Sequence, residues 1–267
     1  MSSPFDHDYE TIRVETATPG VAHLQLDRQE ELNAITRTLL VELSDAVGAL
    51  GRDDDVRVLV LSGSGTRAFS VGAAVRDRLE CLDTETAVDL SRRGQLAFAS
   101  VRWFPGPVIA SIDGYCLGGG MELAAHADLR VAAPGATFGQ PELELGLFPG
   151  WGGTQRLGRL IGTGRAKEVI LTADEYDAET MARYGFVNWV VDDPFDAACD
   201  RAASLANHSR LAQRYAKRAI EYEGDEAGPR FESLAFGHAA GRVGCECAGF
   251  RCPTKSCVRR HRRCPPT

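Results

Sequence analysis

Short apolar runs and longer amphipathic stretches alternate along roughly the first half of the chain. The short runs have the spacing and composition of β-strands, and they cover residues 11–16, 21–27, 56–63, 107–114 and 129–134. Two longer stretches repeat apolar residues every three or four positions, as an amphipathic helix does, and they cover residues 39–50 and 85–104. Strands that alternate with helices are typical of a parallel sheet covered by helices, so the pattern predicts an α/β fold.

The pattern changes after about residue 150, where helical spacing dominates. Helices are predicted over residues 152–162, 164–174, 177–185, 194–209 and 210–224. One further apolar strand is predicted over residues 186–192. The chain is therefore expected to have a sheet-based core followed by a helical C-terminal layer.

The composition is that of an ordinary globular protein, with 44% hydrophobic and 25% charged residues in a chain of 267. This length allows one large domain, or a domain with an appended subdomain. No apolar run has the length of a membrane span, and the acidic N-terminus contains no apolar signal segment. We therefore expect a cytoplasmic protein without a membrane partner.

The net charge of −7 is unevenly distributed. Residues 241–267 contain seven Arg or Lys residues and one Glu, whereas Lys167 and Lys217 are the only lysines before them. An acidic body with few lysines argues against nucleic acid as a partner. A polyanionic ligand would have to be held locally, by backbone N–H groups and a few arginines.

Three consecutive glycines, Gly118 to Gly120, follow the strand at 107–114 and lead to Glu122 on a short apolar helix. Glycines let a backbone approach a ligand closely, because they carry no Cβ. The first N–H groups of a helix lack intrahelical partners, which suits an anion or a charge that develops during a reaction. The same turn could instead serve only strand–helix packing. It is not a phosphate loop, because no Lys-Ser or Lys-Thr follows.

Two further loops are candidates for the same site. Residues 136–157 are rich in Gly and Pro but carry Glu142 and Glu144, and Pro141 restricts the backbone just before the first glutamate. Residues 67–77 follow a buried strand at its carboxyl end, which is the edge where ligands gather in open α/β sheets.

These segments resemble the enoyl-CoA hydratase/isomerase (crotonase) superfamily over about residues 10–235. Three stretches carry the resemblance, namely LDRQEELNAI, RAFSVGA and DGYCLGGGMELAAHADLRVAAPGATFGQPELELGLFPGWGGTQRLGRLIG. The resemblance implies a crotonase-like ββα spiral core over residues 1–195 and a helical layer over residues 196–240 that covers the active site and mediates oligomerisation. It also implies a homo-oligomer, either a trimer or a dimer of trimers.

In this superfamily an acyl-CoA thioester carbonyl lies between two backbone N–H groups, which the resemblance assigns to Ala73 and Gly119. These donors stabilise the enolate-like oxygen that forms when C2 gains or loses a proton. The superfamily's hydratases use two glutamates, which match Glu122, the residue that would activate water for attack on C3, and Glu142, which would deliver a proton to C2. The implied reaction is hydration of trans-2-enoyl-CoA to 3-hydroxyacyl-CoA. Neither a metal nor a separate cofactor is implied, because CoA is part of the substrate. Contacts with the substrate and CoA are implied at Leu32, Ala34, Ala68, Ala74, Val75, Arg76, Gly118, Gly120 and Gly150.

Other functions stay open at this point. They are double-bond isomerisation, hydrolysis, ring-forming synthesis, and a non-catalytic acyl-CoA-binding role. Retention of two glutamates favours hydration, because isomerases of the superfamily usually keep one acid–base carboxylate. We interpret Glu144 as a surface carboxylate, and His126 and Asp128 as supports for the helix end. Four aromatic residues could line the acyl pocket but are expected in the core: Trp103, Phe104, Phe148 and Trp151.

The sequence departs from the superfamily at three places. Ala74 stands where an aspartate usually orders the oxyanion loop. A turn that faces CoA, and often carries a basic residue, here contains Gln29, Glu30 and Glu31. Nearby arginines could compensate: Arg67, Arg76 and Arg78.

Residues 241–267 replace a family-like ending and contain five of the eight cysteines, without zinc-ribbon spacing. We interpret this tail as the product of a reading-frame shift or, alternatively, as a genuine basic tail that contacts CoA phosphates or a metal.

Overall fold

The computed structural model describes residue 5 and residues 7–74, 83–222 and 227–246. The chain divides into two units, one that ends at Arg210 and one that begins at Leu211, and each is described by itself. Within the described residues, no helix combines the length and the apolar character needed to cross a bilayer.

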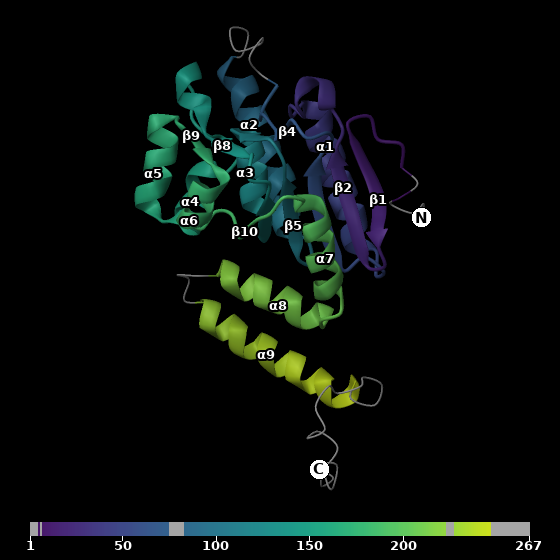
Figure 1. Ribbon diagram of the computed structural model, residues 1–267. Helices are drawn as coiled ribbons and strands as arrows, with labels where there is room; N and C mark the ends of the chain where they lie inside the picture. Colours follow the sequence, from purple (N-terminus) through teal and green to yellow (C-terminus); the bar gives the residue numbers. More distant parts are fainter. Residues whose placement is uncertain (1–4, 6, 75–82, 223–226, 247–267) are drawn as a thin grey trace, which may run out of the picture. The chain divides into compact units, whose positions relative to one another are not determined.

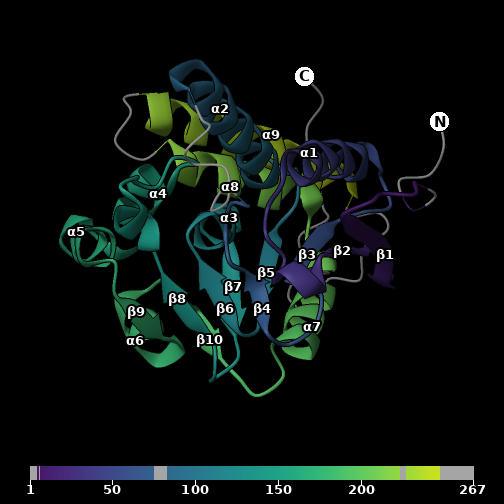
Figure 2. The ribbon, with the colours of Figure 1, turned by 90° about the horizontal axis from the view of Figure 1, so that it is seen from above.

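In the described part of the first unit, a six-stranded sheet runs in the order β1, β2, β3, β5, β7, β10 (Figure 1; all six strands are labelled in Figure 2). Strand β1 pairs antiparallel with β2, and the other neighbours are parallel. The strands are β1 (Ile12–Thr18), β2 (Val21–Leu26), β3 (Val58–Gly63), β5 (Val108–Ile112), β7 (Leu129–Ala132) and β10 (Trp189–Val190). The five strands predicted in the first half of the chain are confirmed. The strand predicted over 186–192 is shorter than expected, because only two of its residues pair with β7.

Side chains alternate between the two faces of this large sheet, as the two-residue period of a strand requires. Leu61 of β3 faces the main core, which it shares with α1 (Arg37–Arg52) and α2 (Thr84–Arg102). Val60 faces the opposite side, which α7 (Pro194–Ala206) covers. Figure 2 shows α1 and α2 on one side of the strands and α7 on the other.

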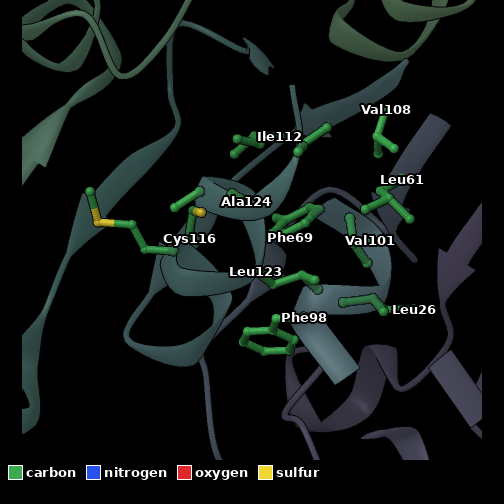
Figure 3. Close-up of a cluster of buried hydrophobic side chains, with 14 of the residues drawn as sticks. Leu26, Leu61, Phe69, Phe98, Val101, Val108, Ile112, Cys116, Leu123 and Ala124 are labelled. Carbon is green, nitrogen blue, oxygen red and sulfur yellow. The ribbon is translucent and has the colours of Figure 1, made fainter. Parts of the chain in front are cut away.

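Both long helices begin where a side chain satisfies a free backbone N–H. Thr36 accepts a hydrogen bond from the amide of Leu39 (3.2 Å) at the start of α1. Asp83 accepts one from the amide of Thr86 (2.7 Å) at the start of α2. The apolar side of α2 then enters the main core, where Phe98 lies in the cluster shown in Figure 3.

A second, four-stranded sheet is present in the described residues, in the order β4, β6, β8, β9. Its strands are β4 (Ala68–Ser70), β6 (Tyr115–Leu117), β8 (Thr137–Gly139) and β9 (Glu175–Asp177). None of them was predicted, because three residues are too few to display a two-residue period. Strands β4, β6 and β8 directly follow β3, β5 and β7, and α2 and α3 (Gly119–His126) follow the first two of these strand pairs. This succession confirms the predicted ββα spiral.

The predicted helices beyond residue 150 are confirmed as α4 (Gly153–Ile161), α5 (Thr163–Thr172), α6 (Ala178–Tyr184) and α7. Sequence analysis assigned α7 to the helical layer that starts at residue 196. In the structure it packs on the large sheet, and the division between the units falls beyond it, after the first residue of the next helix.

The second unit contains most of α8 (Arg210–Glu221) and α9 (Ala227–Glu246). These helices contact each other through the ring of Tyr215, which packs edge-on against Phe231. The hydroxyl of Tyr215 also lies 2.6 Å from Nδ1 of His238. Most of the predicted basic tail, residues 247–267, lies outside the described residues.

Candidate active site

The loop between β3 and β4 is held by one buried asparagine. The side-chain amide of Asn33 donates hydrogen bonds to the carbonyl oxygens of Ser64 (3.0 Å) and Ala68 (2.7 Å). The hydroxyl of Ser70 donates in turn to the carbonyl of Asn33 (2.8 Å). The stretch LDRQEELNAI therefore fixes the loop that precedes Ala73, which gives the asparagine of that stretch a structural role.

Ala73 lies in a parallel bridge with Ile35. The amide of Ile35 donates to the carbonyl of Gly72 (2.8 Å), and the amide of Ala74 donates to the carbonyl of Ile35 (3.0 Å). In such a bridge the residue between the two bonds directs its own N–H to the opposite side. Within the described residues the amide of Ala73 donates no hydrogen bond, so it is available to a ligand.

The second predicted donor, the amide of Gly119, lies beside that of Ala73. It belongs to the first residue of α3 and therefore has no intrahelical acceptor. A Cβ at Gly119 would stand 3.4 Å from the amide nitrogen of Ala73 and 2.6 Å from the indole ring of Trp151. A Cβ at Gly72 would stand 2.7 Å from the amide nitrogen of Gly119. The two backbones thus approach so closely that only glycine fits at either position.

Glu122 lies in the first turn of α3 and is only 2% exposed. Its Oε1 accepts hydrogen bonds from the amides of Trp151 (2.8 Å) and Gly153 (2.6 Å). Burial raises the pKa of Glu122 to about 7, against the lowering effect of hydrogen bonds from the backbone at residues 151–153. The carboxyl group is therefore held in place through one oxygen, Oε1. Its pKa of about 7 lets it gain or lose a proton near neutral pH.

Glu142 lies in the 3-10 helix η4 (Pro141–Leu145), next to the start of α3. A Cβ at Gly118 would stand 2.8 Å from Oε1 of Glu142, and the carbonyl of Gly118 accepts the amide of Glu122 (2.9 Å). Burial raises the pKa of Glu142 to about 7; its own backbone amide lowers it, and the charge of Glu122 raises it. Glu142 therefore lies at the glycine turn, close enough to Glu122 for the charge of Glu122 to raise its pKa.

Sequence analysis missed one residue at this site, Gln140. Its side chain is fully buried, and with its amide nitrogen turned to the carboxyl group it donates to Oε2 (3.0 Å) and Oε1 (3.1 Å) of Glu142. The available signal was its position directly before the Pro-Glu pair. A fully buried amide needs a polar partner, and the carboxyl group of Glu142 is that partner.

The other predicted contact residues occupy the same loops. Leu32 and Ala34 flank Asn33, Ala68 is in β4, and Ala74 is bonded to Ile35. A Cβ at Gly120 would stand 2.3 Å from the carbonyl oxygen of Ser70, so this glycine too serves close packing. The carbonyl of Gly150 accepts hydrogen bonds from Ser91 and Gln95 of α2. Val75, Arg76 and Arg78 lie outside the described residues.

Of the neighbouring candidate residues, two bond to the backbone near the site and two are exposed on the surface. Nδ1 of His126 lies 2.8 Å from the carbonyl oxygen of Glu122, and Asp128 accepts the amide of Val108 (2.7 Å). Glu144 is exposed, and the exposed Glu31 lies 3.7 Å from Arg28.

Two of the four aromatic residues are in the expected place. Phe104 and Trp151 are buried, as predicted. The expectation of a core position was wrong for Trp103 and Phe148, which are 42% and 69% exposed. Trp103 directly follows α2, and Phe148 lies in the loop between η4 and α4, so both side chains are outside the packed elements.

Residues 16–234 match the family model described as enoyl-CoA hydratase/isomerase. The chain belongs to this family. Among its relatives, the crotonyl-CoA hydratase of Syntrophomonas wolfei is 39% identical over 213 residues, which cover 79% of this chain and 81% of the relative. The short-chain-enoyl-CoA hydratase of Clostridium acetobutylicum is 36% identical over 223 residues, covering 81% and 85%. The solved enoyl-CoA hydratase of Bacillus anthracis superposes with a TM-score of 0.81 at 36% identity, covering 85% of this chain and 90% of that one.

Membership of the enoyl-CoA hydratase/isomerase family confirms the resemblance drawn from the three sequence stretches. The fold of the solved relative confirms the crotonase-like architecture. The usual aspartate of the oxyanion loop is absent at Ala74, yet the backbone bond from Ala74 to Ile35 holds the loop up to that residue.

Proposed function

We propose that this chain is an enoyl-CoA hydratase that adds water to trans-2-enoyl-CoA and forms 3-hydroxyacyl-CoA. The observation that carries the proposal is the pair of glutamates: Glu142 lies at Gly118, where the charge of Glu122 raises its pKa. Among the described residues, the amides of Ala73 and of the adjacent Gly119 donate no hydrogen bond. The relatives named as crotonyl-CoA and short-chain-enoyl-CoA hydratases support the same reaction.

The two amides would receive the thioester oxygen of the substrate. Negative charge grows on that oxygen as water adds at C3, because the electrons of the double bond shift toward the carbonyl. Fixed N–H dipoles lower the free energy of this charge without having to reorient, and one such donor is worth about 3–4 kcal/mol. The acyl-CoA itself supplies the CoA group, so the reaction needs no further cofactor.

The two glutamates would handle the proton transfers. The Oε1 of Glu122 is occupied by two backbone amides, which leaves Oε2 to accept a proton from the attacking water. Glu142 would give its proton to C2, so that both substituents arrive on the same side of the former double bond. A pKa of about 7 for each carboxyl group suits these roles, because a group that titrates near the working pH both accepts and releases a proton readily.

Turnover of crotonyl-CoA, followed by the loss of absorbance of the conjugated thioester, tests this function. Glu122→Gln and Glu142→Gln should each lower kcat by about 100-fold or more, because each removes an acid–base group. Glu144→Gln is the matched control: it removes an exposed carboxylate from the same 3-10 helix and should leave turnover unchanged. Turnover of a 3-enoyl-CoA without hydration of crotonyl-CoA would instead identify an isomerase, and tight CoA-ester binding without any turnover would identify a binding protein.

The assembly would be a homo-oligomer, either a trimer or a dimer of trimers. Apolar side chains exposed in and after η4 support association, since exposed apolar clusters usually mark contact surfaces; they are Leu143, Leu145, Leu147 and Phe148. Light scattering on the full chain would measure the mass, and a monomer at working concentration would contradict the proposal.

The enzyme would act in the cytoplasm, in fatty-acid β-oxidation or related acyl-CoA metabolism, and cell fractionation would test that location.

A further inference from the structure

A second group of hydrogen-bonded polar side chains lies on the other face of the large sheet, the face that α7 covers. His23 and Ser62 are buried, whereas the side chain of Glu15 is 68% exposed. Val21 and Val60 mark this face, because both pack in the cluster with α7. His23 and Ser62 lie two residues further along the same strands and therefore share it. Glu15 of β1 is the direct cross-strand partner of His23. By contrast, α3 packs in the main core on the opposite face.

These three side chains form a continuous hydrogen-bonded chain. Nδ1 of His23 lies 2.9 Å from Oε1 of Glu15, and Nε2 lies 2.8 Å from the hydroxyl oxygen of Ser62. A carboxylate can only accept, so Nδ1 carries the proton and donates it to Glu15. Nε2 of the neutral ring is then the acceptor, and the hydroxyl of Ser62 donates to it.

The surroundings keep His23 in this base form. The side chain is 3% exposed, and burial lowers its pKa, against the raising effect of Glu15. A hydroxyl group, a neutral imidazole and a carboxylate in this order have the geometry of an activated nucleophile with its base and its orienting acid. Besides bonding to each other, His23 and Ser62 line a cavity.

The cavity has a volume of about 620 Å³ and is bordered by His23, Ser62, Ser111 and the ring of Phe195. It lies where β3 and β5 end, the edge of a parallel sheet at which ligands bind. Five carboxylates line it, namely those of Glu15, Asp113, Asp192, Asp193 and Asp196. No lysine or arginine is among the described residues that line it. The field inside therefore favours a cation.

We propose that Ser62 is the nucleophile of a second catalytic site, which hydrolyses small esters of cationic alcohols. The hydroxyl oxygen of Ser62 attacks the ester carbonyl carbon, and its proton passes to Nε2 of His23. The bond from the carbonyl carbon to the alcohol oxygen then breaks, and the alcohol leaves with the proton from Nε2. Water loses a proton to the same nitrogen and attacks the acyl-serine. The carboxylic acid is released, and Ser62 regains its proton.

Acetylcholine and its neutral isostere 3,3-dimethylbutyl acetate are the probes, and acid release at constant pH is the measurement. The wild-type chain should hydrolyse acetylcholine faster than the isostere, since the carboxylates attract only the charged ester. Ser62→Ala should lower this hydrolysis by about 100-fold or more, because it removes the nucleophile. Ser100→Ala is the matched control, because Ser100 lies on α2, which packs on the opposite face of the sheet, and its hydroxyl donates to the carbonyl of Ala97. It should keep the activity.

Two further measurements separate this site from the hydratase site and from a folding defect. Glu122→Gln should lose crotonyl-CoA hydration and keep acetylcholine hydrolysis, whereas Ser62→Ala should do the reverse. Diisopropyl fluorophosphate should label the wild-type chain on the peptide that contains Ser62, as read by mass spectrometry, and should label His23→Gln far more slowly. An unlabelled Ser62, or acetylcholine hydrolysis that Ser62→Ala leaves unchanged, overturns the proposal and leaves the three residues as a structural hydrogen-bonded cluster.

Discussion

The two polar clusters on opposite faces of the large sheet are held in place by different parts of the chain. At Glu122 and Glu142 the backbone supplies most of the partners, through the amides of Trp151 and Gly153 and through glycines that permit close approach. At His23 the partners are side chains from neighbouring strands. A site built from backbone groups requires glycine at particular positions, whereas a site built from side chains requires only that the register of the strands is correct.

Burial acts on both clusters in the same direction, toward the uncharged form of each group. It raises the pKa of Glu122 and of Glu142 and lowers that of His23. The difference lies in what opposes it. Backbone N–H groups stabilise the anion of Glu122, but a single carboxylate stabilises the cation of His23. Burial in one fold therefore shifts acid–base groups on both sides of a sheet toward the uncharged form, against different opposing partners.

Gly119→Val is expected to give the largest difference between the two activities, crotonyl-CoA hydration and acetylcholine hydrolysis. Its Cβ would stand 2.6 Å from the ring of Trp151, so the backbone that carries the Gly119 amide would have to move. Hydration of crotonyl-CoA should fall by about 100- to 1,000-fold, the range found when an oxyanion donor is lost. Acetylcholine hydrolysis at Ser62 should stay unchanged.

Gly158→Ala in α4 is the control for this substitution, because no described atom outside the adjoining residues and helix backbone lies within 4 Å of the position of its Cβ. Near-normal hydration in Gly119→Val would show that the two amides do not act together. Loss of both activities would show that the two faces of the sheet are not independent.

A smaller effect is expected from Gln140→Met, which keeps the side chain's size but removes the donor to Glu142. Since a hydrogen bond to a charged group is worth about 1.5–3 kcal/mol, kcat for hydration should fall by about 10-fold or somewhat more. The anion of Glu142 loses a partner, so its pKa should rise and the pH profile of kcat should move to higher pH. A purely structural role would lower the yield of folded protein but leave the profile in place, and Gln155→Met, at an exposed position of α4, is the control.

The smallest effect concerns stability. Burial raises the pKa of Glu122 from 4.5 to about 7, so the folded chain binds this proton more tightly than the unfolded chain does. The stability from this group is present below its unfolded pKa and is lost as the pH rises through about 7. In denaturant titrations, Glu122→Gln should therefore lose less unfolding free energy than the wild type as the pH rises across that window. Glu144→Gln should follow the wild type, and equal slopes for all three chains would contradict the assigned burial effect.

Sequence alone determined the elements that are long enough to show a period. The apolar stripe of α1 and the buried runs of β3 and β5 were read correctly, because each repeats its pattern over several residues. The small sheet could not be predicted from the sequence, because its three-residue strands are stabilised by partners far away in the chain. The exposure of Trp103 and Phe148 could not be predicted for the same reason, since burial depends on neighbours that the local pattern does not contain.

The same division runs through the chemistry. Glycines before a glutamate, and the resemblance that they support, were enough to propose Ala73, Gly119, Glu122 and Glu142 as one site. Tertiary structure alone placed Gln140 on Glu142 and joined Glu15, His23 and Ser62. A local motif can reveal a close approach of two backbones, because a position where a Cβ would clash requires glycine. Which side chains meet across strands is decided by register and topology, which no short stretch of sequence contains.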